Sequence, residues 1–295
     1  NRISPVQRKL MTTGKDENVF NIAVKGNFDD CQNLVKSMFS DKEFSNQINM
    51  SGVNSINWAR IIAQSVYYFY CYFLAEDDNQ PINFSVPTGN FGDVYAGYLA
   101  KKLGLPINKL IVATNQNDIL HRAISKGKYE AEHVSETISP SMDIQIASNF
   151  ERLIYDLNSH DSSQTLDDMK NIKQNGKYTI DDEKLKKINQ DFLSARMSEQ
   201  ETLDVIKNIY EKFNMVLDPH TAIGYGAFDK HDLKGNNIVL ATAHPCKFPD
   251  AILKAINLKS DLPDELKFIL DEEENYGIIE NSFKEIKQYI LGKIK

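Results

Sequence analysis

The stretch INFSVPTGNFGDVYAGYLAKKLGLPINKLIVA, residues 82–113, decides the fold of this chain. Residues 82–87 alternate like a strand, and residues 89–93 form a tight turn that contains two glycines. Residues 94–103 then read as a helix that stops at Gly104, and residues 110–113 form a second apolar strand. A strand, a helix and a second strand make a βαβ unit. This order predicts an α/β protein with a parallel sheet flanked by helices.

Residues 59–75 are the most apolar stretch upstream of this unit. Their apolar side chains follow helical spacing, so we predict a buried helix. The side chains expected on its buried face are Ile62, Val66, Phe69, Tyr70 and Phe73. Arg60, Gln64 and Ser65 interrupt the stretch, which is also too short to span a bilayer.

A short acidic and polar segment, residues 76–81, separates this helix from the βαβ unit and is the best candidate for a domain boundary. We therefore expect residues 1–79 to belong to a smaller lobe and residues 80–295 to a larger one. Downstream, the pattern of residues 137–215 predicts mostly helices.

The composition excludes several classes of partner. Thirty-four basic and 41 acidic side chains give a net charge of −7, which argues against a nucleic acid or an anionic membrane as the main partner. Cys31, Cys71 and Cys246 are few and far apart in the sequence, so we expect reduced thiols and a cytoplasmic protein. The first five residues resemble no signal or transit peptide.

The strongest local motif is the turn PTGNFGD, residues 87–93, between the predicted strand and helix. Gly89 and Gly92 permit close approach of the backbone, and amide groups at a helix N-terminus favour a phosphate. The spacing matches neither a dinucleotide fingerprint nor a nucleoside-triphosphate loop. A single phosphate ester and an ordinary strand-to-helix turn are the two open interpretations.

A second motif, NSINWAR at residues 54–60, begins the predicted helix. Asn54 and Ser55 at the helix N-terminus and the guanidinium of Arg60 form a possible clamp for an oxyanion. The alternative is a helix cap with Arg60 in a structural ion pair, and capping residues of this kind are common.

Three further polar residues lie in turns. His244 and Cys246 follow a predicted strand at residues 237–242, but Pro245 between them and the lack of a third orienting group argue against a catalytic Cys–His pair. His220 lies in a similar turn, where it either faces the cleft or braces it. Two isolated histidines make a weak case for a metal site, and we expect none.

Six segments together resemble the threonine synthase family in its longer form. They are NSINWARIIAQSVYYF (54–69), VPTGNFGDVYAGYLA (86–100), LIVATNQNDIL (110–120), ISPSMDIQIASNFERL (138–153), LDPHTAIG (217–224) and ATAHPCKF (241–248). Their order and spacing hold across essentially the whole chain.

The resemblance implies a pyridoxal-phosphate enzyme of the tryptophan-synthase-β-like fold (fold type II). Such an enzyme converts O-phospho-L-homoserine and water to L-threonine and phosphate, the last step of threonine biosynthesis. By resemblance, Gly89, Asn90, Phe91 and Asp93 bind the cofactor phosphate, and Thr242 hydrogen-bonds the pyridine nitrogen. The segment with Asn54, Ser55 and Arg60 resembles the site for the substrate phosphate.

The family's Schiff-base lysine has no counterpart in this sequence, because it lies on a segment N-terminal to the part that matches. The chain therefore resembles the C-terminal two-thirds of a threonine synthase, with an incomplete smaller lobe, and we expect it to be inactive alone. Two alternatives stay open, a non-catalytic phosphate-binding homologue and a related lyase for another phosphorylated amino acid. The oligomeric state is left open.

Overall fold

The computed structural model describes residues 4–26, 28–54, 57–75 and 80–294. The chain divides into two compact units, Asn1–Gly52 with Asp261–Lys295 and Val53–Ser260. These units do not coincide with the ranges 1–79 and 80–295, because the C-terminal segment of the chain pairs with the N-terminal one. The assignment of a smaller and a larger lobe stays a prediction.

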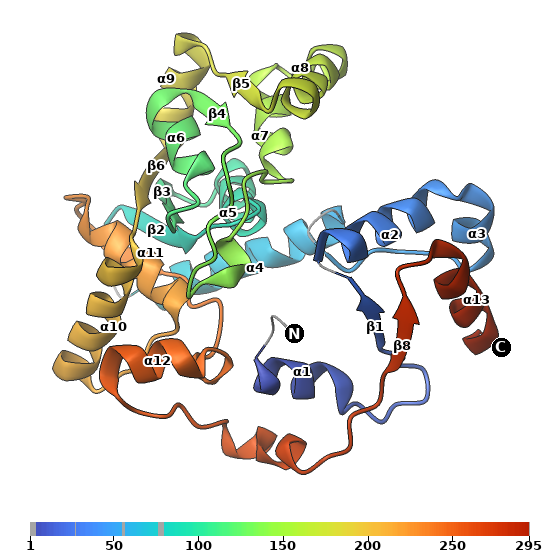
Figure 1. Ribbon diagram of the computed structural model, residues 1–295. Helices are drawn as coiled ribbons and strands as arrows, with labels where there is room; N and C mark the ends of the chain where they lie inside the picture. The colour runs from blue at the N-terminus through green and yellow to red at the C-terminus, as the bar shows by residue number, and fades with distance from the viewer. Residues whose placement is uncertain (1–3, 27, 55–56, 76–79, 295) are drawn as a thin grey trace. The chain divides into compact units, whose positions relative to one another are not determined.

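The unit that contains both chain ends is built around two parallel strands, β1 (Ile22–Lys25) and β8 (Gly277–Glu280), which lie side by side in Figure 1. Its helices are α1 (Pro5–Thr12), α2 (Phe28–Ser40), α3 (Lys42–Gln47), the 3₁₀ helix η3 (Asp264–Leu270) and α13 (Phe283–Lys293). Leu34, Met38, Phe44 and Ile286 form its buried core. Residues far apart in the sequence thus share one hydrophobic cluster.

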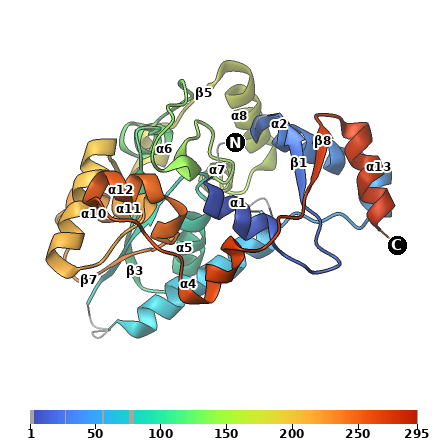
Figure 2. The ribbon, with the colours of Figure 1, turned by 60° about the horizontal axis from the view of Figure 1, so that its bottom comes forward.

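The larger unit, Val53–Ser260, contains a parallel sheet with the strand order β6-β3-β2-β7 (Figures 1 and 2). Its strands are β2 (Ile82–Pro87), β3 (Ile107–Thr114), β6 (Phe192–Arg196) and β7 (Asn236–Val239). The βαβ unit and the parallel sheet expected from residues 82–113 are confirmed. An antiparallel pair, β4 (Lys128–Glu130) and β5 (Lys177–Thr179), lies outside this sheet.

Helices surround the sheet. They are α4 (Trp58–Leu74), α5 (Gly92–Lys102), α6 (Ile119–Lys126), α7 (Phe150–Leu157), α8 (Ser162–Asn175), α9 (Asp182–Asp191), α10 (Glu199–Phe213), α11 (Pro219–Asp229) and α12 (Pro249–Ile256). Two 3₁₀ turns, η1 (Pro140–Met142) and η2 (Pro245–Lys247), lie in the connections.

Strand β3 has buried apolar side chains on both faces of the sheet, and helices pack against each face. Leu110 and Val112 point into the cluster that contains α5, whereas Ile111 and Ala113 pack with residues of α11. Successive side chains of a strand point to opposite faces, so a strand this apolar requires helices on both sides.

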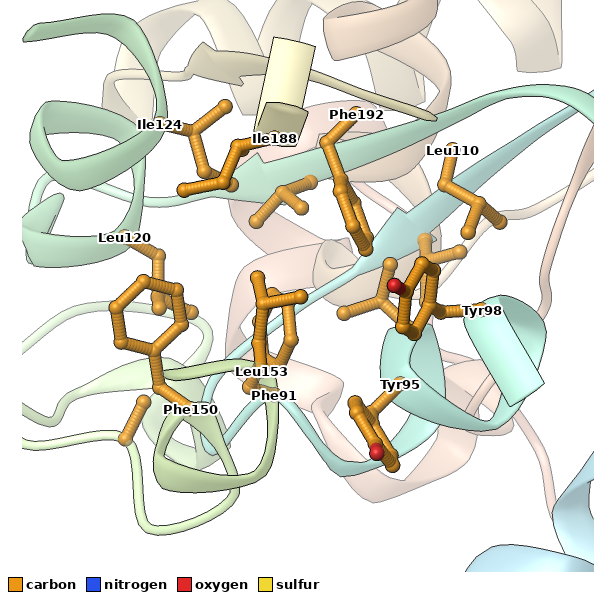
Figure 3. Packing of buried hydrophobic residues seen from close by; sticks show 14 of the residues in the cluster. Phe91, Tyr95, Tyr98, Leu110, Leu120, Ile124, Phe150, Leu153, Ile188 and Phe192 are labelled. Carbon is orange, nitrogen blue, oxygen red and sulfur yellow. The ribbon is translucent and has the colours of Figure 1, made fainter. Parts of the chain in front are cut away.

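Aromatic rings fill the cluster on the α5 face, where Figure 3 shows Phe91, Phe150 and Phe192 converging beneath the sheet. The ring centroids of Phe91 lie 5.2 Å from Phe150 and 5.7 Å from Phe192. All three side chains are fully buried. Each such burial contributes roughly 1.5–3 kcal/mol relative to an exposed side chain, so this cluster holds the start of α5 firmly in place.

The helix predicted at residues 59–75 is confirmed as α4, but its predicted buried face is wrong. Ile61, Ser65 and Tyr68 are the buried side chains, whereas Phe73 is 75% exposed. The other exposed members of the predicted face are Ile62, Val66 and Tyr70. Gly97 of α5 decides the orientation, because a Cβ there would lie 2.4 Å from the Tyr68 ring. Almost every position of α4 is apolar, so helical periodicity alone does not select the face.

Candidate functional site

A cavity of about 270 Å³ opens at the carboxyl end of β2, within the larger unit. Its volume is near the lower end of small-molecule sites, roughly 300–1,000 Å³. The carboxyl ends of parallel strands are where open α/β sheets place ligands. The residues that line it are Arg60, Gln64, Pro87, Gly89, Asn90, Asp93, Ser141, Met142, His220, Thr242 and Ala243.

The turn between β2 and α5 provides one wall. Asn90 accepts a hydrogen bond at its Oδ1 from the backbone N–H of Gly92, at 2.9 Å. Phe91 has a φ of +69°, in the left-handed region, and α5 begins directly after it without a side-chain cap. The first amides of a helix have no intrahelical acceptor and carry partial positive charge. The N–H of Gly92 is used by Asn90, so the donors that this turn can offer to an anion are its other amides.

Phe91 is not among the residues that line the cavity. Its ring is fully buried in the aromatic cluster and does not line the cavity. That Phe91 binds the cofactor phosphate stays a prediction, and its buried ring leaves only the main chain for such a contact. The strained φ of a bulky residue is held in place by the packing of its own ring.

Gly89 is required where the turn meets the segment before α7. A Cβ at this position would lie 2.6 Å from the carbonyl oxygen of Ser141. The carboxylate of Asp143 fixes that segment, because its Oδ1 accepts from Asn115 Nδ2 at 2.8 Å and from Thr137 Oγ1 at 2.6 Å. This polar network keeps Ser141 against the turn, so that both line the same cavity.

Asp93 lies in the first turn of α5 and is held by α4. The hydroxyl of Tyr68 donates to its backbone oxygen at 2.8 Å and lies 3.2 Å from its Oδ1. Burial raises the pKa of Asp93 to about 6, and the hydrogen bond from Tyr68 and the charge of Arg60 partly oppose this rise. The carboxylate thus lines the cavity while it joins two helices.

Helix α4 supplies two polar side chains one turn apart, Arg60 and Gln64, and both line the cavity. Residues at i and i+4 lie on the same face of a helix. Arg60 donates from Nη1 to the carbonyl oxygen of Val53 at 2.9 Å. None of the ion pairs between described residues includes Arg60. The described residues therefore do not support the alternative that Arg60 forms a structural ion pair.

The structure does not place the two other residues predicted for the substrate phosphate, Asn54 and Ser55, at the cavity. Ser55 lies outside the described residues. Asn54 accepts at its carbonyl oxygen from the N–H of Asn57 and is not among the residues that line the cavity. Asn57, not Asn54, caps α4, because its Oδ1 accepts from the N–H of Ala59 at 3.0 Å.

Thr242 follows β7 and lines the cavity, as does Ala243. The strand predicted at residues 237–242 is shorter, since β7 ends at Val239 and Leu240 makes the last backbone bond to Ser85. The chain leaves the sheet after this bond, and Thr242 is exposed. His244 beyond it accepts at Nδ1 from the N–H of Cys246, at 3.2 Å, and so braces the turn.

His220 both braces the fold and faces the cavity. Asp218 caps α11 and accepts at Oδ1 from the N–H of His220 at 2.9 Å, and from the Nδ1 of the same residue at 3.0 Å. The His220 side chain is buried, and its Nε2 has no hydrogen-bond partner among the described residues. His220 is also one of the residues that line the cavity.

The sequence motifs did not identify Gln64, Ser141 or Met142 as site residues, although all three line the cavity. Gln64 could have been found from its spacing of four residues from Arg60, because this spacing places both side chains on one face once a helix is predicted there. Ser141 and Met142 reach the site through a folded connection, which no local pattern encodes.

Comparisons with known proteins agree with this arrangement. A family model described as threonine synthase, C-terminal, matches residues 221–290. The threonine synthase of Saccharomyces cerevisiae is 45% identical over 97% of this chain, and that of Pseudomonas aeruginosa is 42% identical over 98%. This chain is similar to the threonine synthases along almost its whole length. The resemblance expected from the six segments is thereby confirmed.

Solved threonine synthases share the fold. The structure titled as PLP-bound threonine synthase from Brucella melitensis has a TM-score of 0.94 and 44% identity, and it covers 99% of this chain. The yeast threonine synthase follows with a TM-score of 0.89 and 42% identity. These likenesses confirm the expected fold class, an α/β enzyme fold of the pyridoxal-phosphate type II group.

The chain spans about 62% of the length of the curated threonine synthases that it matches. It covers 63% of the Brucella melitensis and yeast structures. Within the described part of the chain, no helix is long and apolar enough to cross a membrane. Nor do the described residues bring three His, Cys, Asp or Glu side chains together as a metal site.

Proposed function

We propose that this chain provides the cofactor- and substrate-binding part of a threonine synthase, a pyridoxal-phosphate-dependent carbon–oxygen lyase acting on a phosphate ester. The reaction is the conversion of O-phospho-L-homoserine and water to L-threonine and phosphate, in the cytoplasm. The observation that carries the proposal is that the turn at residues 89–93, Arg60 and Thr242 line one cavity in a chain 42–45% identical to threonine synthases.

The residues present fit pyridoxal 5'-phosphate. The cavity has a helix N-terminus for the phosphate at one wall and a hydroxyl, that of Thr242, at another. Two of its lining residues, Gln64 and His220, each have one buried polar atom without a partner among the described residues. The bound cofactor supplies the electron sink that allows bonds at the substrate carbon atoms to break and form.

Each residue then has a defined task. The amides after Gly89 bind the cofactor phosphate, and Asn90 holds the turn in shape through Gly92. Thr242 offers a neutral hydroxyl to the pyridine nitrogen, which leaves that nitrogen without a proton. Arg60 pairs with the substrate phosphate, for which a planar guanidinium is well suited. Asn54 and Ser55 complete this phosphate site.

Asp93 stabilises the turn without contacting the phosphate. Its carboxylate would repel a phosphate at close range, but the hydroxyl of Tyr68 draws it toward α4. The positive end of α5 offsets only part of the cost of burying this charge, because burial is the largest effect on the pKa of Asp93 and raises it. We therefore assign it to bracing the start of the helix.

The proposed activity is tested with the protein that carries this sequence, purified from its natural source. It should release phosphate and form L-threonine from O-phospho-L-homoserine. Failure to form threonine, with another phosphorylated amino acid consumed instead, would point to a related lyase.

A second candidate applies to the 295-residue chain by itself, namely binding without catalysis. None of the described residues that line the cavity is a lysine. Incubation with pyridoxal phosphate and borohydride, followed by peptide mapping, should find no single modified lysine, and the chain should form no threonine. A site-specific adduct on one lysine would contradict this candidate.

A further inference from the structure

One face of helix α4 is exposed although it is apolar along its length. Its side chains follow one another at intervals of three or four residues, so they form a single stripe along the helix. These residues, which we call the α4 stripe, are Ile62, Val66, Tyr70 and Phe73. They are between 47% and 75% exposed.

The composition of α4 is typical of a helix inside a protein. Arg60 is the only charged residue among its 17 residues, and Arg60 lines the cavity. A helix that is hydrophobic all round is normally buried on all sides. Ile61, Ser65 and Tyr68 bury one side of α4, whereas the stripe lies on another side. An exposed apolar patch of this kind is typical of a contact surface.

The other compact unit has an uncovered apolar surface of its own. Among the described residues, its sheet consists of the two parallel strands β1 and β8. Ile22 and Ile279 pack against the core of that unit, whereas Ile278 is 64% exposed. Parallel sheets are normally covered on both faces, and a pair of strands by itself is marginally stable. Each unit, taken by itself, thus leaves apolar surface without cover.

The comparisons indicate what covers the stripe. The chain spans 62% of the threonine synthase of Pseudomonas aeruginosa, so the other 38% of that relative has no counterpart here. The family model that matches residues 221–290 is described as C-terminal, so the unmatched part precedes the match. A polypeptide of that size can cover a 17-residue helix, which is roughly 26 Å long. A second copy of this chain would instead have to bury the stripe through a self-complementary contact, and it would leave the surface at Ile278 unexplained.

We infer that the α4 stripe is a docking surface for an apolar polypeptide segment, the one that forms the N-terminal 38% of the Pseudomonas aeruginosa relative. This inference goes beyond the proposed function, because it concerns an interaction surface and not the ligand site. None of the four stripe residues lines the cavity, although Arg60 and Gln64 of the same helix do. A segment docked on the stripe therefore covers α4 without occupying the cavity.

Lysine substitutions test the surface. Val66→Lys and Tyr70→Lys change positions that are 60% and 63% exposed, so the chain alone should tolerate them. Under a docked segment the same lysine would lose its contact with water, which destabilises the protein. Leu166→Lys is the matched control, because Leu166 is 56% exposed on α8 and lies outside the stripe.

The test compares the 295-residue chain with a fusion in which the unmatched N-terminal segment of the Pseudomonas aeruginosa threonine synthase precedes Asn1. Differential scanning calorimetry measures the midpoint temperature of unfolding. In the chain alone, all three variants should stay within about 2 °C of wild type. In the fusion, Val66→Lys and Tyr70→Lys should lower the midpoint by at least about 5 °C, whereas Leu166→Lys should not. Amide hydrogen exchange in α4 should also be slower in the fusion than in the chain alone.

Three results would overturn the inference. The first is a fusion whose midpoint is unchanged by both stripe variants. The second is a chain that is destabilised by both variants without the added segment, since another part of this chain would then cover the stripe. The third, measured by sedimentation velocity, is a wild-type chain that dimerises and a Val66→Lys chain that does not, because a second copy would then be the occupant. The proposed function is tested separately, since the stripe does not line the cavity.

Discussion

The hydroxyl of Tyr68 lies 2.8 Å from the backbone oxygen and 3.2 Å from the carboxylate oxygen of Asp93, and so ties helix α4 to the first turn of helix α5. Gly97 permits this contact, because any larger residue would collide with the Tyr68 ring. The contact links the helix that carries Arg60 and Gln64 to the turn that carries Gly89. The two walls of the cavity are thereby held together within one unit.

The first prediction concerns Asp93 and pH. Burial raises its pKa from 3.8 to about 6, so between these values the folded state binds more protons than the unfolded state. Stability contributed by this group is therefore lost as pH rises from about 4 to about 6. Asp93→Asn removes this loss and should raise the free energy of unfolding by about 2–3 kcal/mol at pH 7, and by little at pH 4.

Urea unfolding at a series of pH values measures this difference. Asp204→Asn is the control, because Asp204 is exposed on α10. A difference between Asp93→Asn and wild type that does not depend on pH would show that the carboxylate is not disfavoured by burial.

The second prediction concerns Arg60 in substrate binding. Arg60→Lys replaces a planar fork by a point charge and should weaken O-phospho-L-homoserine binding by about 1–2 kcal/mol. Arg196→Lys is the control, because Arg196 is exposed and outside the cavity. Calorimetric titration is the measurement. If a folded Arg60→Lys protein binds O-phospho-L-homoserine as tightly as wild type, Arg60 has only a structural role, through its hydrogen bond to the carbonyl oxygen of Val53.

The third prediction tests Gly89. Gly89→Ala places a methyl group 2.6 Å from the carbonyl oxygen of Ser141, which the Asp143 network holds in place. Overpacking of this kind costs about 1–3 kcal/mol, and it should also weaken binding of pyridoxal phosphate because the turn must move. Gly292→Ala is the control, since no atom lies within 4 Å of the added methyl group. A Gly89→Ala protein with the melting temperature and cofactor affinity of wild type would contradict the assignment.

The fourth prediction concerns Thr242. Thr242→Asp adds a negative charge beside the expected pyridine nitrogen, which should favour a proton on that nitrogen while cofactor affinity stays near that of wild type. Nitrogen NMR of ring-labelled pyridoxal phosphate reports the proton directly. Thr242→Ser keeps the hydroxyl and should leave the spectrum unchanged. If Thr242→Asp abolishes binding of the cofactor, Thr242 does not face that nitrogen.

Much of the site follows from local sequence. The βαβ unit and its turn are encoded within residues 82–113, because strand alternation, glycine positions and helix spacing all act over short distances. The motif at residues 54–60 points to Arg60, the family resemblance points to Thr242, and both residues line the cavity. The apolar face of α4 was not predictable, because its orientation depends on Gly97 in another helix.

Other features depend on contacts that no local pattern contains. The pairing of β1 with β8 joins residues about 250 positions apart, so the compact units differ from the ranges expected. Sequence motifs left His220 either facing the cleft or bracing the turn, whereas in the structure it contacts Asp218 and is also one of the residues that line the cavity. The burial of the Phe91 ring follows from the aromatic cluster assembled by α7 and β6.

The central claim is that this chain binds pyridoxal 5'-phosphate through its phosphate, at the turn between β2 and α5. The most direct measurement compares the dissociation constants of pyridoxal 5'-phosphate and of pyridoxal, which lacks the phosphate, for the 295-residue chain by equilibrium dialysis. Pyridoxal 5'-phosphate should bind at least about a hundredfold more tightly, since a dianion at a helix N-terminus forms several charge-assisted hydrogen bonds. Equal affinities for the two compounds, or no binding of either, would contradict the account.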